Sequence, residues 1–407
     1  MAHRRSATAQ WREDRFRQLH GYVGQLVTGL VGKSLEEHRD HLADPRVPLL
    51  TRRGWIPREP LPLDDVQLRY SAPRVDRFDA AKRLLAPYWP TVEGATVPTY
   101  SAAVDAYAKP SMFFNAPSFR LFGLDPSVPD TSLTLTMGSY FDWYDTGEAL
   151  GYEAAKRYVE TGGATIVGPY RQSLADPFHF AGRCATPGVN TLTIRASRRG
   201  PVFYLHRRTS VATARGTVHV VPAGEFQPSG GPHSGHTTGG DDLDLRSTII
   251  REYAEELLGA PDVNDPRTHG TPVDFTAQHA DVESALRGGG ARCHYLGCGL
   301  YPLTWKPEIL TVCVFEERLF DRVFAAMERE TMEGRLEGRG GRLLSDDDRL
   351  PGTLDAMRGG KKRPYQGLPF DQETVQTYVN DPTTLPAARA CLDLAWRHRQ
   401  ALRIRTR

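Results

Sequence analysis

The sequence of 407 residues lacks any long apolar run. No stretch approaches the roughly 18–20 consecutive apolar residues that a membrane-spanning helix requires, so we expect no membrane association. The sequence also lacks an excess of charge of one sign, because its 51 Lys and Arg residues nearly balance its 49 Asp and Glu residues. The formal net charge of +2 therefore gives no electrostatic case for binding nucleic acid.

Cysteine is scarce as well. The five cysteines are Cys184, Cys293, Cys298, Cys313 and Cys391. An odd number without C-x-x-C spacing argues against a disulfide framework and against a zinc knuckle, and makes a reducing cytoplasm the expected location. We expect the cysteines between 293 and 313 to be buried core residues. The basic start of the chain is followed by polar instead of apolar residues, which argues against a signal peptide.

The first forty residues predict two helices. Apolar residues recur at spacings of three and four over residues 11–31, and Gly32 is the expected stop. A capping box that begins at Ser34 predicts a second helix to about His41, but its acidic face argues against direct DNA binding. The run from Gly32 to Ser34 also imitates the end of a P-loop, yet Val27 stands where that loop needs a glycine.

Further along, short β-rich runs alternate with helical patterns. Strands are expected near residues 111–114, 132–136, 191–195, 202–206, 217–221, 294–301 and 309–315, and helices near 146–160, 244–258, 317–332 and 385–402. Three acidic residues before or at the start of the helix at 146 are explained by capping and the helix dipole: Asp142, Asp145 and Glu148. This order of elements predicts an α+β fold, a mixed β-sheet flanked by helices.

Composition divides the chain into five parts. These are N-terminal helices with a Pro-rich connector (1–95), an α/β segment (96–184), a core domain (185–335), a Gly-rich linker (336–366) and a C-terminal helical extension (367–407).

The helix expected at 244–258 carries the most chemistry. At about 100° per residue, Glu252, Glu255 and Glu256 fall within one sector of its surface. Carboxylates so close repel one another, so a divalent cation such as Mg²⁺ or Mn²⁺ is the expected partner, held against a substrate's phosphates. The alternative is a solvated acidic face paired with Arg251 and other bases.

The run from Arg251 to Glu256, R-E-Y-A-E-E, resembles the R-E-U-x-E-E core of the Nudix box, in which U is aliphatic. Residues 220–224 look like the strand and turn that precede the box in that family. The resemblance implies a Nudix-like domain over residues 185–335. In it, Glu252, Glu255 and Glu256 would bind the metal, Arg251 would orient one of them, Gly224 would be the box glycine, and Arg207 or Arg208 would contact substrate.

The sequence departs from the family pattern around this core. The loop after Gly224 carries an insertion that includes His233 and His236, which we expect to be exposed and not metal ligands. Leu243 replaces an upstream glutamate of the box, for which Asp242 or Asp244 could substitute. Candidate bases for activating water are Glu308 and Glu316, at the two ends of the strand expected at 309–315.

Two hypotheses follow from the resemblance. The first is a divalent-metal-dependent hydrolase of a nucleotide-derived diphosphate, in which water attacks a phosphoanhydride. The second is a catalytically inactive Nudix-fold sensor that binds such a small molecule and signals through its helical extensions. Residues from about 100 to 400 are also broadly similar to the region that follows the DNA-binding domain in some actinobacterial regulatory proteins. A homodimer is left open.

Overall fold

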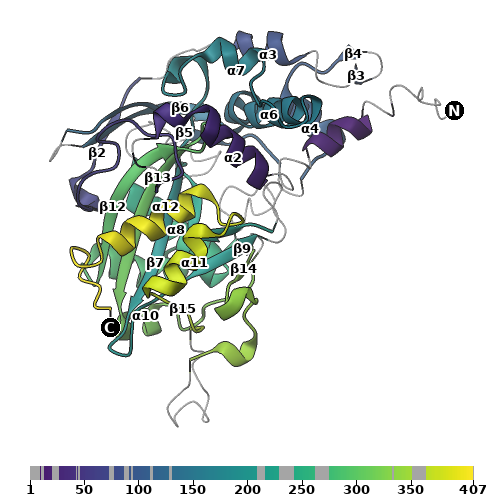
Figure 1. Ribbon diagram of the computed structural model, residues 1–407. Coiled ribbons are helices and arrows are strands. Elements are labelled where there is room, and N and C mark those ends of the chain that lie inside the picture. The colour runs from purple at the N-terminus through teal and green to yellow at the C-terminus, as the bar shows by residue number, and fades with distance from the viewer. Residues whose placement is uncertain are drawn as a thin grey trace.

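Figure 1 shows the computed structural model, a central β-sheet with helices on both faces and a helical region beyond one end of its strands. The structure describes residues 10, 13–20, 27–42, 44, 46–72, 78–86, 91–92, 95–110, 113–127, 131–208, 216–228, 243–261, 275–331, 334–350 and 364–406. Helices and strands alternate along the chain, and the strands pair both parallel and antiparallel. The α+β class expected from the sequence is confirmed.

The central sheet is built around two long parallel strands. These are β7 (Gly188–Ala196) and β13 (Pro307–Glu316), and β12 (Ala291–Leu300) pairs antiparallel with the other edge of β13. Short strands extend the sheet: β1 (Leu61–Pro62), β8 (Val202–Phe203), β11 (Ala223–Glu225) and β15 (Leu368–Pro369). The strands expected near 191–195, 294–301 and 309–315 are confirmed by these pairings.

Helices cover both faces of the central sheet because its long strands are apolar on both faces. The covering helices are α8 (Leu245–Leu258), α11 (Gln372–Asn380) and α12 (Pro386–Arg397). One face presents Leu192 and Val312 to the cluster that contains α12, which lies in front of the sheet in Figure 1. On the other face, the hydroxyls of Thr193 and Tyr253 lie 2.8 Å apart and join β7 to α8.

The other elements form smaller layers around this core. The strands are β2 (Gln67–Tyr70), β3 (Thr91–Val92), β4 (Ala95–Thr96), β5 (Pro117–Asp125), β6 (Ser132–Ser139), β9 (Leu205–Arg208), β10 (Val218–Val220) and β14 (Gly334–Leu336). The helices are α2 (Val27–Glu37), α3 (Asp79–Leu85), α4 (Tyr100–Tyr107), α5 (Tyr140–Trp143), α6 (Ala149–Glu160), α7 (Pro169–Leu174), α9 (Phe275–Arg287) and α10 (Glu317–Val323). Within the described ranges, no helix has both the length and the apolar character needed to cross a membrane.

Helix α2 differs from the sequence expectation. It runs through Gly32, which the sequence predicts as a stop, and through Ser34, which the sequence predicts as a cap. Ser34 is buried, and its hydroxyl donates a 2.6 Å hydrogen bond to the carbonyl oxygen of Pro302. The predicted boundary is wrong because this tertiary anchor and the buried face around Leu30 outweigh the modest cost of a glycine inside a helix.

Other boundaries also shift. The strand expected at 111–114 is wrong where it is described, since residues 113–116 are irregular and β5 begins at Pro117. The helix expected at 317–332 ends at Val323. β14 pairs with β9 and ends at Leu336, the first residue of the segment predicted as a linker. The C-terminal helix ends at Arg397, earlier than the expected residue 402.

The cysteines are buried as expected, but two of them are bonded. Cys293 on β12 and Cys313 on β13 are direct cross-strand partners with Cα atoms 4.3 Å apart, and their sulfurs form a disulfide. The sequence argument against disulfides is therefore wrong for this pair. Sequence spacing gave no signal because the two residues meet through strand register. The remaining cysteines, Cys184, Cys298 and Cys391, are free and buried.

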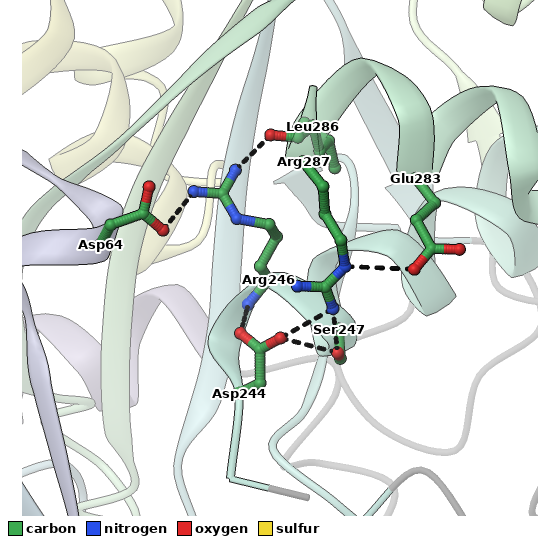
Figure 2. Close-up of polar contacts among 7 residues, drawn as sticks. All are labelled: Asp64, Asp244, Arg246, Ser247, Glu283, Leu286 and Arg287. Atoms are coloured by element: carbon green, nitrogen blue, oxygen red, sulfur yellow. Dashed lines mark hydrogen bonds and ion pairs between the residues drawn. The ribbon is translucent and has the colours of Figure 1, made fainter. Parts of the chain in front are cut away.

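The start of α8 is fixed by a network of charged side chains (Figure 2). The carboxylate of Asp244 caps the helix by accepting a 2.8 Å hydrogen bond from the backbone N–H of Arg246. Arg287 of α9 donates to Asp244 at 2.8 Å, while Arg246 reaches Asp64 at 2.5 Å. Asp244 is therefore committed to holding α8 against α9, and Asp242 lies outside the described residues.

Candidate functional site

A cavity of about 330 Å³ opens where β7, β11 and β13 meet the beginning of α12. Polar and aromatic groups line it together: Tyr140, Trp143, Glu148, Gly188, Asn190, Arg208, His219, Ala223, Gly224, Glu225, Tyr301, Thr304, Lys306, Glu308, Leu385 and Ala387. Its volume lies within the usual range for small-molecule sites. Three carboxyl groups and two cationic side chains in one cavity make it the strongest candidate for a functional site among the described residues.

Strand register brings two of the carboxyl groups together. Gly188 on β7 lies between Glu308 on β13 and Glu225 on β11, so the three residues form one row across the sheet. A Cβ added at Gly188 would lie 2.6 Å from Oε2 of Glu308. The glycine therefore leaves the room that the carboxyl group of Glu308 occupies. Asn190 fixes that group further by donating a 2.7 Å hydrogen bond to Oε2.

Glu225 is neutralised within the cavity wall. Its Oε2 accepts a 3.1 Å hydrogen bond from Nζ of Lys306, and its Oε1 accepts a 2.8 Å hydrogen bond from the hydroxyl of Ser118. The same Nζ lies 4.2 Å from the centre of the Trp143 ring, a favourable position for a cation. Lys306 is thus held between a carboxylate and an aromatic face.

The third carboxyl group comes from a break in helical geometry. Between α5 and α6 the chain forms a π-helical turn over residues 144–148, and Glu148 is its last residue. Such single turns cost stability and occur frequently at functional sites. The capping interpretation holds for Asp142, which is bonded to the N-cap Ser139, but it is wrong for Glu148, which lies inside a continuous helical run and lines the cavity.

Burial dominates the electrostatics of these groups. It raises the pKa of Glu148 and that of Glu308 to about 7, although Lys306 lowers both. Burial alone would lower the pKa of Lys306, but Glu225 and Glu308 raise it above its ordinary value. The cavity therefore holds an ammonium ion beside carboxyl groups that exchange protons close to neutral pH.

Two further donors come from the small sheet beside the cavity. Arg208 is the last residue of β9, and His219 lies on β10. Burial, with Arg208 and His206 nearby, lowers the pKa of His219 to about 3, so its ring is neutral. Because Nδ1 of His219 accepts a 2.8 Å hydrogen bond from the N–H of Val220, the ring proton resides on Nε2.

The residues predicted on α8 gather behind this wall. Arg251 donates a 2.8 Å hydrogen bond to Glu252 and a 3.0 Å hydrogen bond to the carbonyl oxygen of Glu225. Both side chains are buried. A Cβ added at Gly224 would lie 2.0 Å from the carboxyl group of Glu252, so only glycine allows this close approach. The structure thus brings together Gly224, Arg251 and Glu252.

The other two glutamates of α8 have different surroundings. Glu256 is buried, accepts a 3.1 Å hydrogen bond from the N–H of Ala223, and lies 3.4 Å from Nδ1 of His206. Glu255 is partly exposed. Gly224 lines the candidate cavity, whereas Glu252, Glu255 and Glu256 do not. In the described part of the chain, no group of three or more His, Cys, Asp and Glu side chains is arranged to hold a metal ion.

The two predicted substrate arginines point to different places. Arg208 lines the cavity. Arg207, its neighbour on β9, pairs instead with Glu337 at 2.5 Å and donates to the carbonyl oxygen of Gly216 at 2.9 Å. Of the two candidate bases, Glu308 lies in the cavity and Glu316 is exposed at the end of β13. His233 and His236 lie outside the described residues.

Sequence reasoning missed Glu148, Glu225 and Lys306. A cluster of this kind leaves no local pattern, because its members come from segments that only the fold brings together. A comparison of the chain with protein-family models finds no match, and a comparison with curated proteins finds none either. The geometry of the cavity is therefore the basis for assigning a function.

Proposed function

We propose that the protein is a Nudix-like sensor that binds a nucleotide-derived small molecule in this cavity. The observation that carries the proposal is a pair of groups of opposite charge that the fold leaves available. Neither Arg208 nor Glu148 forms a side-chain hydrogen bond or ion pair with any described residue, although both line the cavity.

The guanidinium group of Arg208 suits the phosphate end of such a ligand. Its Nε is buried without a hydrogen-bond acceptor in the described part of the chain. A buried donor without an acceptor is costly, and a phosphate relieves that cost while matching the charge and planar geometry of the guanidinium group. The carboxyl groups and aromatic rings of the remaining wall suit the nucleoside end, which carries hydrogen-bond donors and a flat ring.

The parts of the chain that build the cavity favour a sensor over a minimal enzyme. The π-helical turn at 144–148 and the start of α12 both lie outside the predicted core domain at 185–335, and both line the cavity. A ligand that contacts these two segments stabilises the conformation that it binds relative to other conformations of the same segments. Binding can therefore be transmitted to the flanking helices, as a sensor requires.

The contacts of α8 also favour this choice. Glu252 is held by Arg251, and Glu256 by the N–H of Ala223 beside His206. These carboxylates do not form an open oxygen cage in this arrangement, so they do not fit a Mg²⁺ or Mn²⁺ ion without giving up those contacts.

A second candidate is the divalent-metal-dependent hydrolase, and one observation favours it. Glu308, a residue that the sequence suggests as a base, lies in the cavity with a pKa of about 7, close to the value that suits general-base catalysis near neutral pH. In that case Glu252, Glu255 and Glu256 would hold Mg²⁺ or Mn²⁺ after exchanging their present partners.

The cytoplasmic location stays a prediction.

One experiment separates the two candidates. The full chain is incubated with nucleoside mono- and diphosphates and with nucleoside diphosphates esterified to a sugar, with Mg²⁺ or with EDTA. Thermal unfolding reports binding, and chromatography of the nucleotide reports cleavage. A sensor raises the unfolding temperature in EDTA and returns the nucleotide intact. Mg²⁺-dependent cleavage that Glu252→Gln abolishes would establish the hydrolase instead, and absence of both effects would refute the proposal.

A further inference from the structure

Glu148 is a buried residue whose carboxyl group has no hydrogen-bond or ion-pair partner among the described residues. Its side chain belongs to a residue that is only 9% exposed, and no described residue donates a hydrogen bond to it. Leaving a buried carboxyl group unsatisfied is expensive, because water can no longer solvate it fully. Glu153 on α6, a buried acid of the same helical run, shows the contrast, because it accepts hydrogen bonds of 2.8 and 2.9 Å from two backbone N–H groups of α7. Glu148 differs from Glu153 in that it lines the cavity, where a ligand can supply the missing donor.

The nearest cation does not fill that position. Lys306 lies close enough to lower the pKa of Glu148, but its Nζ is bonded to Glu225 at 3.1 Å and stacked over Trp143. Arg208 also acts on Glu148 only through space, without an ion pair. The acceptor capacity of Glu148 thus remains available to a ligand.

Aromatic rings surround this acceptor. Tyr140, Trp143 and Tyr301 line the same cavity, and the carboxyl group of Glu148 acts electrostatically on both tyrosines. Flat apolar walls around one carboxylate suit a flat ring that carries an amino group, because the ring packs on the walls while the amine donates to the oxygen. A sugar or a free phosphate lacks this combination.

We propose that Glu148 determines specificity by accepting a hydrogen bond from the exocyclic amine of a nucleobase. The ligand is then a nucleotide with an amino-bearing base, and its phosphate lies toward Arg208. This inference rests on the proposed function and names the ligand class of that same cavity. A base with a carbonyl oxygen at the same position places an acceptor against an ionised acceptor, and both groups lose their hydrogen bonds.

Two pairs of nucleotides test this directly: AMP with IMP, and CMP with UMP. Within each pair a carbonyl oxygen replaces the exocyclic amino group, and the adjacent ring nitrogen gains a hydrogen. We measure their dissociation constants by calorimetry on the full chain at pH 8, where Glu148 is mainly ionised. The unchanged protein should bind the amino member of at least one pair about tenfold or more tightly than its partner. Glu148→Gln should remove or invert that preference, because the amide can donate to a carbonyl oxygen.

Glu160→Gln is the matched control. Glu160 lies on α6, in the same helical run, but is exposed and pairs with Lys156 outside the cavity. This variant should keep the preference of the unchanged protein. Equal affinity within both pairs on the unchanged protein would overturn the inference while leaving the proposed function standing. If no nucleotide binds at all, the proposed function fails and this inference fails with it. The comparison on unchanged protein needs no variant to fold.

Discussion

Asn190 donates a 2.7 Å hydrogen bond to Oε2 of Glu308 on the neighbouring strand. The geometry depends on Gly188, where an added Cβ would lie 2.6 Å from the same oxygen. We predict that Gly188→Ala displaces Glu308 and lowers the free energy of unfolding by about 2 kcal/mol, as overpacking of a buried site usually does. Urea unfolding measures the change.

The control for this substitution is Gly32→Ala. A Cβ at Gly32 meets nothing within 4 Å, and the residue lies inside α2. Alanine there should raise the free energy of unfolding by up to about 1 kcal/mol through helix propensity. Similar losses at both glycines would contradict the steric account of Gly188.

The contact between Gly224 and Glu252 gives a second prediction. A Cβ at Gly224 would lie 2.0 Å from the carboxyl group of Glu252, too close for either group to remain in place. Gly224→Ala should therefore destabilise the protein by about 3 kcal/mol or more. In a Glu252→Ala background the same substitution should cost much less, because the clashing group is gone. Equal costs in both backgrounds, measured by urea unfolding, would show that the two residues are not coupled.

The raised pKa of Glu148 predicts a pH dependence. The folded protein keeps this carboxyl group protonated up to about pH 7, whereas the unfolded chain releases the proton near its ordinary value of 4.5. Between these pH values the folded state binds more protons, so the contribution of Glu148 to stability falls as the pH rises through this window. Glutamine does not titrate. The free energy of unfolding of Glu148→Gln, relative to that of the unchanged protein, should therefore rise by up to about 3 kcal/mol between pH 4.5 and pH 8.

Urea unfolding of both proteins at pH 5 and pH 8 checks this value. Comparing the two proteins at each pH cancels the titration of groups that the substitution does not disturb. The neighbours that act on Glu148 are Lys306, Glu225 and Arg208, and all three are retained in the variant. A difference in stability that is the same at pH 5 and pH 8 would contradict the assignment of a raised pKa to Glu148.

Lys306 supplies a further prediction about the cavity wall. Its Nζ lies 3.1 Å from Glu225, and the two side chains are 18% and 13% exposed. Lys306→Met leaves the carboxylate of Glu225 without its cation beside two more carboxyl groups. We therefore expect the free energy of unfolding to fall by about 3 kcal/mol. The double variant Lys306→Met/Glu225→Gln should recover part of that loss in urea unfolding. A double variant less stable than the single one would argue against this ion pair as the cause.

Local patterns in the sequence predicted much of the fold. The β-rich runs inside β7 and β13 and the helical spacing of α8 are strong signals, since each of these elements is long and packs against the core. Boundaries were less predictable. Gly32 signals a stop in an isolated helix, but the contact between Ser34 and Pro302 joins residues 268 positions apart, and no local pattern reveals it.

The cavity could be predicted only in fragments. Arg208, Gly224 and Glu308 were named from the sequence, whereas Glu148 had a sufficient local explanation as a helix-start residue. Glu148, Glu225 and Glu308 come from three distant segments, and strand register with the π-helical turn brings them into one cavity. The acidic run on α8 was the conspicuous signal, yet two of its three glutamates are buried against partners behind the cavity wall.

The central claim is that the cavity binds a nucleotide, with Arg208 holding its phosphate. Calorimetric titration of AMP into the unchanged protein, Arg208→Gln and Arg207→Gln tests it most directly. Arg207 is the adjacent arginine on β9 but lies outside the cavity, bonded to Glu337. The account predicts binding to the unchanged protein and to Arg207→Gln, and a loss of affinity of about tenfold or more in Arg208→Gln. Equal affinity in all three proteins, or a loss confined to Arg207→Gln, would contradict it.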